Sequence, residues 1–299
     1  MNRIVLFIVV IGCILGIKDA YALESLKKTV AVFDFQNDSG WAGSATLGQD
    51  FGTQLSDALV QSGKFIVLSR QDLVPVMAEQ DMANSDRFAK SSTAKLGKIV
   101  PAQLLIKGKI TEFQENKSGG QGLSLYGVSI NTAKASAHIA IIIQLINSTT
   151  GEIVESKRVE GEATAGGTSL GYSGVVNFGS SDFQATPLGK AVQVTIDRAV
   201  DYLAKKSADI PWGGKVMMVK DGTIYVNSGT NAGLKEGDTF FVSKVGEALV
   251  DPDTGMSLGS ENKKLGQIKI VEVQEKFSKA NPVGSLAGDV SKGDMVSEK

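Results

Sequence analysis

Few side chains in this sequence have the types and spacing that catalysis or metal binding requires. The 299 residues include a single histidine, His138, and a single cysteine, Cys13. A disulfide, a metal site built from cysteines and the usual pairing of a nucleophile with a base all need more such residues. Carboxylates and serines are plentiful, but none has a spacing typical of catalysis. We therefore expect a protein that is not an enzyme, with no catalytic residue, cofactor or metal.

The first 22 residues have the pattern of a secretory signal peptide. One positive charge precedes the apolar run Ile4 to Ile17, which is too short for a membrane-spanning helix and leads to a cleavage triplet, Ala20-Tyr21-Ala22. Cleavage there predicts an exported protein that begins near Leu23. A second interpretation stays open, because Val10-Ile11-Gly12-Cys13 fits a lipobox, in which the cysteine carries a lipid.

Residues 23–208 follow the pattern of an α/β or α+β domain. The run Thr29 to Phe35 predicts a strand, and the apolar spacing from Leu47 predicts a helix that ends at Gly63. Further strands are predicted at Phe65 to Leu68 and from Gln103, and helices are predicted after Ser69, near residues 93–99 and after Thr186. Alternating strands and helices are typical of an α/β fold.

Two stretches rich in Gly and Ser predict long β-hairpins, at about 113–143 and 159–186. From Asn131 to Ile143 the residues alternate with period two, so that small apolar side chains share one face and polar side chains share the other. A turn at Ser148 to Gly151 leads into a return strand. The alternation continues well past this turn, which indicates strands that extend beyond a compact domain.

Residues 209–299 contain only strand patterns and predict a small all-β module, such as a small barrel. Because a Pro-Trp-Gly-Gly linker precedes it, we expect residues 210–299 to fold independently. Its Gly-Asp turns resemble those of C-terminal modules in envelope-assembly proteins such as the flagellar FlgT family. These turns are Gly237-Asp238, Gly288-Asp289 and Gly293-Asp294.

Five segments between Lys28 and Lys205 carry a resemblance to the CsgG family of curli secretion channels and their relatives. They are Val30 to Gly40, Gly63 to Arg70, Ile106 to Ile110, Ser118 to Gly120 and Leu145 to Ile153. The resemblance implies a periplasmic α/β domain that assembles into a ring with itself. It also implies two hairpins per subunit in a shared outer-membrane barrel, through which unfolded polypeptide leaves.

The resemblance also implies places for individual side chains. Trp41 would contribute to a pore constriction, although the loop that carries it is shorter than in the channels. On the hairpins, the polar positions would face the lumen: Lys134, His138, Glu160 and Glu162. The apolar positions would face the membrane: Ala133, Ala135, Leu170, Tyr172, Val176 and Phe178.

Both His138 and the hairpins have simpler structural interpretations. His138 is more simply a polar-face residue of a strand, and the hairpins are alternatively soluble arms. The protein would then be a periplasmic scaffold or accessory protein that binds envelope-assembly partners without forming a pore. The net charge of −1 provides no basic field to recruit nucleic acid.

Overall fold

The computed structural model describes residues 26–42, 44–70, 76–78, 101–118, 123–125, 128–130, 134–166, 181–253 and 257–298. The signal peptide with Cys13 lies outside these residues. So do the helix predicted near residues 93–99 and five of the predicted membrane-facing positions, namely Ala133, Leu170, Tyr172, Val176 and Phe178.

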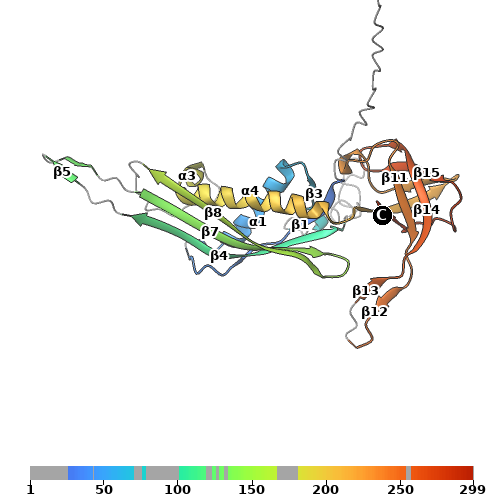
Figure 1. The fold of residues 1–299 in the computed structure, drawn as a ribbon, viewed down its shortest axis with the longest axis horizontal. Coiled ribbons are helices and arrows are strands. Elements are labelled where there is room, and N and C mark those ends of the chain that lie inside the picture. Colours follow the sequence, from blue (N-terminus) through green and yellow to red (C-terminus); the bar gives the residue numbers. More distant parts are fainter. Residues whose placement is uncertain are drawn as a thin grey trace, which may run out of the picture.

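A mixed sheet organises the first domain, in the order β3-β1-β4-β7-β8 (Figure 1). Strands β1 (Lys28–Val32), β3 (Phe65–Val67) and β4 (Leu104–Ser118) are parallel, and the short β2 (Gln36–Asn37) also pairs with β4. Strand β7 (Lys134–Asn147) pairs antiparallel with β4, and β8 (Ile153–Gly166) pairs antiparallel with β7. The predicted α/β pattern is therefore present, with an antiparallel extension.

Helices cover one face of this sheet. Helix α1 (Leu47–Gln61) ends before Gly63, whose φ of 65° favours glycine, as the sequence predicted. Helix α4 (Pro187–Ala208) is capped by Thr186, whose hydroxyl accepts a hydrogen bond from the Gly189 N–H. The apolar faces of both helices join the strands in one core, and α4 runs lengthwise along β7 and β8 (Figure 1).

Strands β4, β7 and β8, which pair antiparallel with one another, are unusually long. They span 15, 14 and 14 residues, compared with a usual length of about five to six. The turn predicted between β7 and β8 is confirmed, and a small hairpin of β5 (Leu123–Leu125) and β6 (Val128–Ile130) lies between β4 and β7 in the chain. The second hairpin was predicted to reach residue 186, which is wrong, because Ser181–Ala185 form helix α3. Phe183 of α3 is buried in the core, and this burial favours the helix.

The C-terminal residues form a closed barrel in the order β10-β15-β14-β11-β16-β9. Its strands are β9 (Gly213–Lys220), β10 (Thr223–Val226), β11 (Thr239–Lys244), β14 (Lys263–Val273), β15 (Ser278–Val283) and β16 (Met295–Ser297). A 3-10 turn, η1 (Thr230–Ala232), precedes β11. Strands β12 (Ala248–Val250) and β13 (Ser257–Ser260) form an arm that projects from the barrel (Figure 1).

The first described residues join the two domains. Leu26 is buried in the barrel core, although it precedes the first strand of the other domain. The Lys27 N–H donates to the Ala232 carbonyl, and Gln103 Nε2 donates to the Gly213 carbonyl at 2.8 Å. Burial lowers the pKa of Lys28 at this junction, despite the Glu298 and Asp209 carboxylates nearby. A segment of residues 210–299 alone would therefore lack part of its own core.

We expect Leu26→Ala to destabilise the barrel by about 2–3 kcal/mol, because the smaller side chain leaves a cavity in its core. Leu26 is 8% exposed, and Trp212 in the same core reports on the barrel. The measurement is thermal unfolding followed by Trp212 fluorescence in a Trp41→Phe background. Leu249→Ala is the matched control, since this leucine is 50% exposed. Equal losses in both variants would contradict the structural contribution of Leu26.

Candidate functional site: the charged face of the long strands

The face of β4, β7 and β8 opposite the helices carries a set of charged side chains. In the β7–β8 ladder His138 pairs with Glu162, and Ala140 pairs with Glu160. The register places the even-numbered residues of both strands on this face, because side chains of paired residues point the same way. Three of the four polar positions predicted to share a face therefore lie together.

A β-bulge at Thr111 brings Glu112 to the same face. Ile110 pairs with Ile141, whereas Glu112 pairs with the next residue of β7, Ala140, so Thr111 is an extra residue in the ladder. Without it, Glu112 would point into the core and Phe113 toward solvent, because a shift of one residue exchanges the faces of a strand. In the structure Phe113 is buried and Glu112 is accessible.

Ion pairs link these residues across the three strands. His138 lies between two carboxylates, with Nε2 3.1 Å from Glu112 Oε2 and Nδ1 3.2 Å from Glu162 Oε1. Both contacts are hydrogen bonds only when both ring nitrogens carry hydrogen, which is the charged imidazolium. Arg158 donates from Nε to Glu160 at 2.6 Å and from Nη2 to Glu112.

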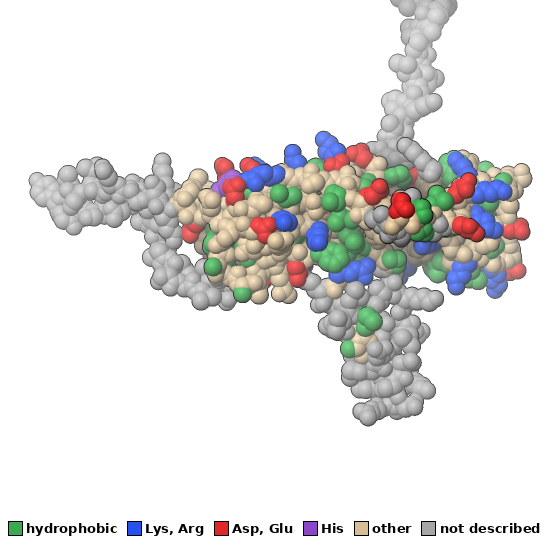
Figure 2. All heavy atoms as spheres, turned by 90° about the horizontal axis from the view of Figure 1, so that it is seen from below, with side chains coloured by type: hydrophobic (Ala, Val, Ile, Leu, Met, Phe, Trp, Pro, Cys, Tyr) green, Lys and Arg blue, Asp and Glu red, His purple; other side chains and the backbone are tan. Residues whose placement is uncertain are grey.

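The hydrogen bond from Arg158 lowers the pKa of Glu112, and the hydrogen bonds to Glu160 and Glu112 raise the pKa of Arg158. These groups therefore stay ionised at neutral pH. The cluster around His138 and Arg158 has three carboxylates against one guanidinium and one imidazole, so it is net negative whether or not His138 is charged. Lys107 and Lys109 of β4 lie farther along the same face. Acidic and basic side chains and the histidine gather along one margin of the elongated domain (Figure 2). Such a cluster suits contact with water and cations.

Two predicted site residues have other surroundings. Ala135 is only 7% exposed and shares a face with Ala137 and Ile139, which lie in the core beneath the helices. Within the subunit it is therefore covered, which corrects the expectation that its side chain is open to lipid. The apolar members of the β7 pattern form the helix-facing side of the sheet. Lys134 begins β7, and its side chain lies outside the described part of the chain.

Trp41 packs against the edge of the core of the first domain. Its ring centroid lies 4.7 Å from that of Phe113, and it joins the margin of the core. Asn37 holds the loop by donating from Nδ2 to the Trp41 carbonyl at 2.9 Å. Within the subunit this indole therefore has a packing contact, and its place in a constriction stays a prediction.

A second polar cluster, which the sequence analysis did not predict, links α4 to β8. The Tyr202 hydroxyl donates to Glu155 Oε2 at 2.7 Å, and Lys206 Nζ lies 2.9 Å from Glu155 Oε1. Arg198, one helical turn earlier, donates to the Glu160 carbonyl. The only local signal is the spacing of these three side chains, which places them on one face of a helix.

We expect Tyr202 to titrate at about pH 12. Burial and the hydrogen bond to Glu155 raise its pKa from 10.0 to about 12. The raised pKa contributes stability below pH 10 that is lost as the pH rises toward 12, because the unfolded chain ionises first. Ultraviolet absorbance of phenolate, compared with that of a Tyr202→Phe variant, measures this titration. A difference spectrum centred near pH 10 would contradict it.

The described residues contain neither a metal site nor a membrane-spanning helix. They contain no group of three or more His, Cys, Asp or Glu side chains placed to hold a metal ion. No helix among them has the length and apolar character needed to cross a bilayer.

Curated relatives with a similar sequence share one description. Two curated relatives, both called curli production assembly/transport component CsgG, come from Salmonella typhimurium strain LT2 and Escherichia coli strain K12. Each is 27% identical over 139 residues, covering 42% of this chain and 50% of the relative. The chain thus spans about half the length of these curated relatives.

Similar solved structures include the hypothetical protein CT253 from Chlamydia trachomatis, with a TM-score of 0.38 and 14% identity over 60% of this chain and 96% of that one. Another is lipoprotein GNA1162 from Neisseria meningitidis, with a TM-score of 0.27 and 13% identity over 60% of this chain and 99% of that one. The model of the family described as curli production assembly/transport component CsgG matches residues 17–233, most of the chain. The chain belongs to the CsgG family.

Proposed function

We propose that this protein is a subunit of an oligomeric secretion channel in the bacterial outer membrane, which passes unfolded polypeptide through a shared β-barrel. Family membership supports a component of a curli-type secretion system. The proposal places the signal peptide in the inner membrane during export and the first domain in the periplasm. Its partners would be copies of itself, the outer membrane and the exported polypeptide.

One observation supports the channel most directly, namely the two-sided character of the long strands. Strands β4, β7 and β8 separate their polar and apolar side chains onto opposite faces along 14 or 15 residues, as the strands of a membrane barrel do. Within the subunit the helices cover the apolar face. The charged face with His138, Glu160 and Glu162 would line water. In this arrangement the segments that follow β4 and β8 in the chain continue into the membrane.

The test combines microscopy with electrophysiology on the detergent-extracted full-length protein. We expect ring-shaped particles in electron micrographs and stepwise conductance in planar bilayers. The proposed channel fails if the protein remains monomeric in detergent and never conducts.

A second function, an envelope scaffold without a pore, is favoured by the barrel module. Most of the barrel lies beyond residue 233, where the family match ends. Its arm exposes Leu249 and Val250 at 50% and 53%, which is typical of a contact surface for another protein. A scaffold would assemble with envelope proteins but would give no conductance in the same bilayers.

A further inference from the structure

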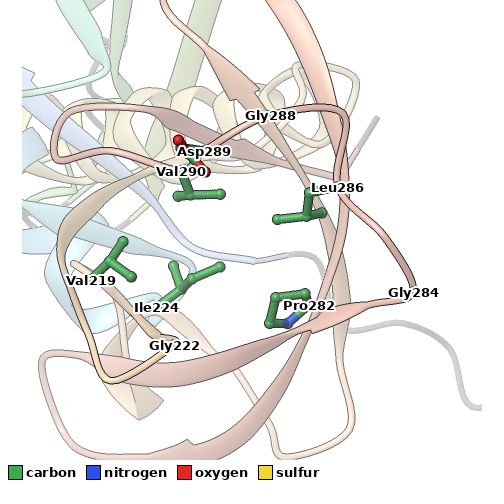
Figure 3. A pocket seen from close by; sticks show the side chains of 9 residues that line it. All are labelled: Val219, Gly222, Ile224, Pro282, Gly284, Leu286, Gly288, Asp289 and Val290. Atoms are coloured by element: carbon green, nitrogen blue, oxygen red, sulfur yellow. The ribbon is translucent and has the colours of Figure 1, made fainter.

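The C-terminal barrel has an open mouth at the end where β9 meets β10 and where β15 finishes (Figure 3). The cavity there has a volume of about 580 Å³. Its walls are mainly aliphatic, with three glycines and one carboxylate. The residues that line it are Val219, Gly222, Ile224, Pro282, Gly284, Leu286, Gly288, Asp289 and Val290.

The mouth is open because β15 extends farther than its neighbour β10 along the barrel. Strand β15 pairs with β10 only as far as Ala280, opposite Ile224, but it continues beside β14 as far as Val283. The last residues of β15 therefore have a neighbouring strand on one side only. A gap results between this end of β15 and the turn that joins β9 to β10, around Gly222.

The interior of the mouth continues the apolar core of the barrel. Ile224 is buried in that core, and Leu286 and Val290 pack against it from the loop after β15. Val219 is 41% exposed, so apolar surface remains uncovered at the entrance. Unburied aliphatic surface at a concave site favours binding of another apolar group.

Asp289 supplies the charge at this site. It is the one charged side chain among the lining residues, and it has no ion pair within the described part of the chain. A carboxylate beside an apolar cavity attracts a cation and repels anionic groups, including the phosphates of lipids. The occupant should therefore combine an apolar group with a positive charge.

We propose that this mouth binds an extended polypeptide segment, with an aliphatic side chain in the cavity and a Lys or Arg beside Asp289. A free small molecule needs most of its surface enclosed, whereas a peptide needs only one side chain inside an open mouth. The site gives the barrel module a binding function that goes beyond the channel and does not depend on it.

The arm of a second copy fits the mouth less well. Leu249 and Val250 are exposed and apolar, but the next residue is Asp251, and Asp253 follows it. These acidic side chains would approach Asp289 and repel it. Charge therefore favours a basic segment of another polypeptide over the arm of this chain.

The test uses the full-length protein and a fluorescein-labelled peptide, Ser-Leu-Gly-Lys-Gly-Leu-Ser, in a fluorescence anisotropy titration. In the extended chain its Lys and both Leu side chains share one face. Two further peptides replace Lys by Glu, or both Leu residues by Ser. We expect Asp289→Asn to weaken binding of the Lys peptide about threefold, as for an exposed charge pair. Val219→Asp, at an exposed position of the wall, should abolish binding. Glu236→Gln is the control, since this exposed carboxylate precedes β11 at the other end of the barrel.

Two peptide results support the proposal: weaker binding of the Glu peptide and no binding of the Ser peptide. Circular dichroism of each variant establishes that its fold is intact. The proposal is overturned if Asp289→Asn and Val219→Asp bind the Lys peptide as the unmodified protein does. It is also overturned if no peptide binds the unmodified protein. Loss of self-association by Val219→Asp or Leu249→Ser in analytical ultracentrifugation would then show that a second copy occupies the mouth.

Discussion

Replacing Gly161 by valine should destabilise the first domain by about 3 kcal/mol, the upper part of the usual range for overpacking a core. A Cβ atom at Gly161 would lie 2.1 Å from Thr195 Oγ1 and 2.4 Å from the Ala191 carbonyl oxygen. Thr195 cannot move freely, because its hydroxyl donates to the same carbonyl at 2.7 Å. The larger side chain must therefore push α4 away from β8. The measurement is urea denaturation followed by circular dichroism at helical wavelengths.

Thr164→Val is the matched control for this substitution. Thr164 lies on the same strand but is exposed on the opposite face, so we expect a change within about 0.5 kcal/mol. Similar midpoints for Gly161→Val and Thr164→Val would show that α4 does not pack closely on β8. The contact matters for function, because the helix fixes the strand that carries Glu160 and Glu162.

The double substitution Glu160→Lys and Glu162→Lys should reverse the ion preference of the proposed channel. Both residues lie on the charged face, and the change reverses two of its three carboxylates. It also places a lysine beside Arg158 and another beside His138, which makes this face strongly positive. A ring repeats the change in every subunit, so the effect on permeating ions is multiplied. The measurement is the reversal potential of planar bilayers in a salt gradient.

Asp197→Lys is the control for charge alone. Asp197 is exposed on α4, outside the charged face, and its contact is with Gln193. We expect its reversal potential to match that of the unmodified protein. If the double variant conducts with unchanged selectivity, the charged face does not line the pore, even if the pore exists.

The periodicity of the sequence determined much of the first domain. Alternation from Asn131 to Ile143, the turn at Ser148 to Gly151 and the return strand predicted β7 and β8 correctly. Thr186 and Pro187 predicted the start of α4, and Gly63 predicted the end of α1. These features are local, because side-chain period, capping and turn chemistry depend on neighbours in the chain. The family resemblance was carried by such segments as well.

The same periodicity does not show what the apolar face of the hairpin packs against. Alternation shows that Ala135 shares a face with Ala137 and Ile139, but both lipid and a helix would suit that face. Only the folded structure, in which Ala135 is 7% exposed, shows that the chain covers this side chain itself. Similarly, Trp41 has the type expected of a constriction, and only the approach of Phe113 shows its packing partner.

The sequence by itself determined the long strands β7 and β8, helices α1 and α4 and the polar residues available to the candidate site. Tertiary structure decided which of these residues come into contact. The bulge at Thr111 brings Glu112 to His138 and Arg158, a group drawn from three strands. Leu26 completes a barrel that begins almost two hundred residues later. Strand register and shared cores depend on contacts between distant segments, and no local pattern encodes those contacts.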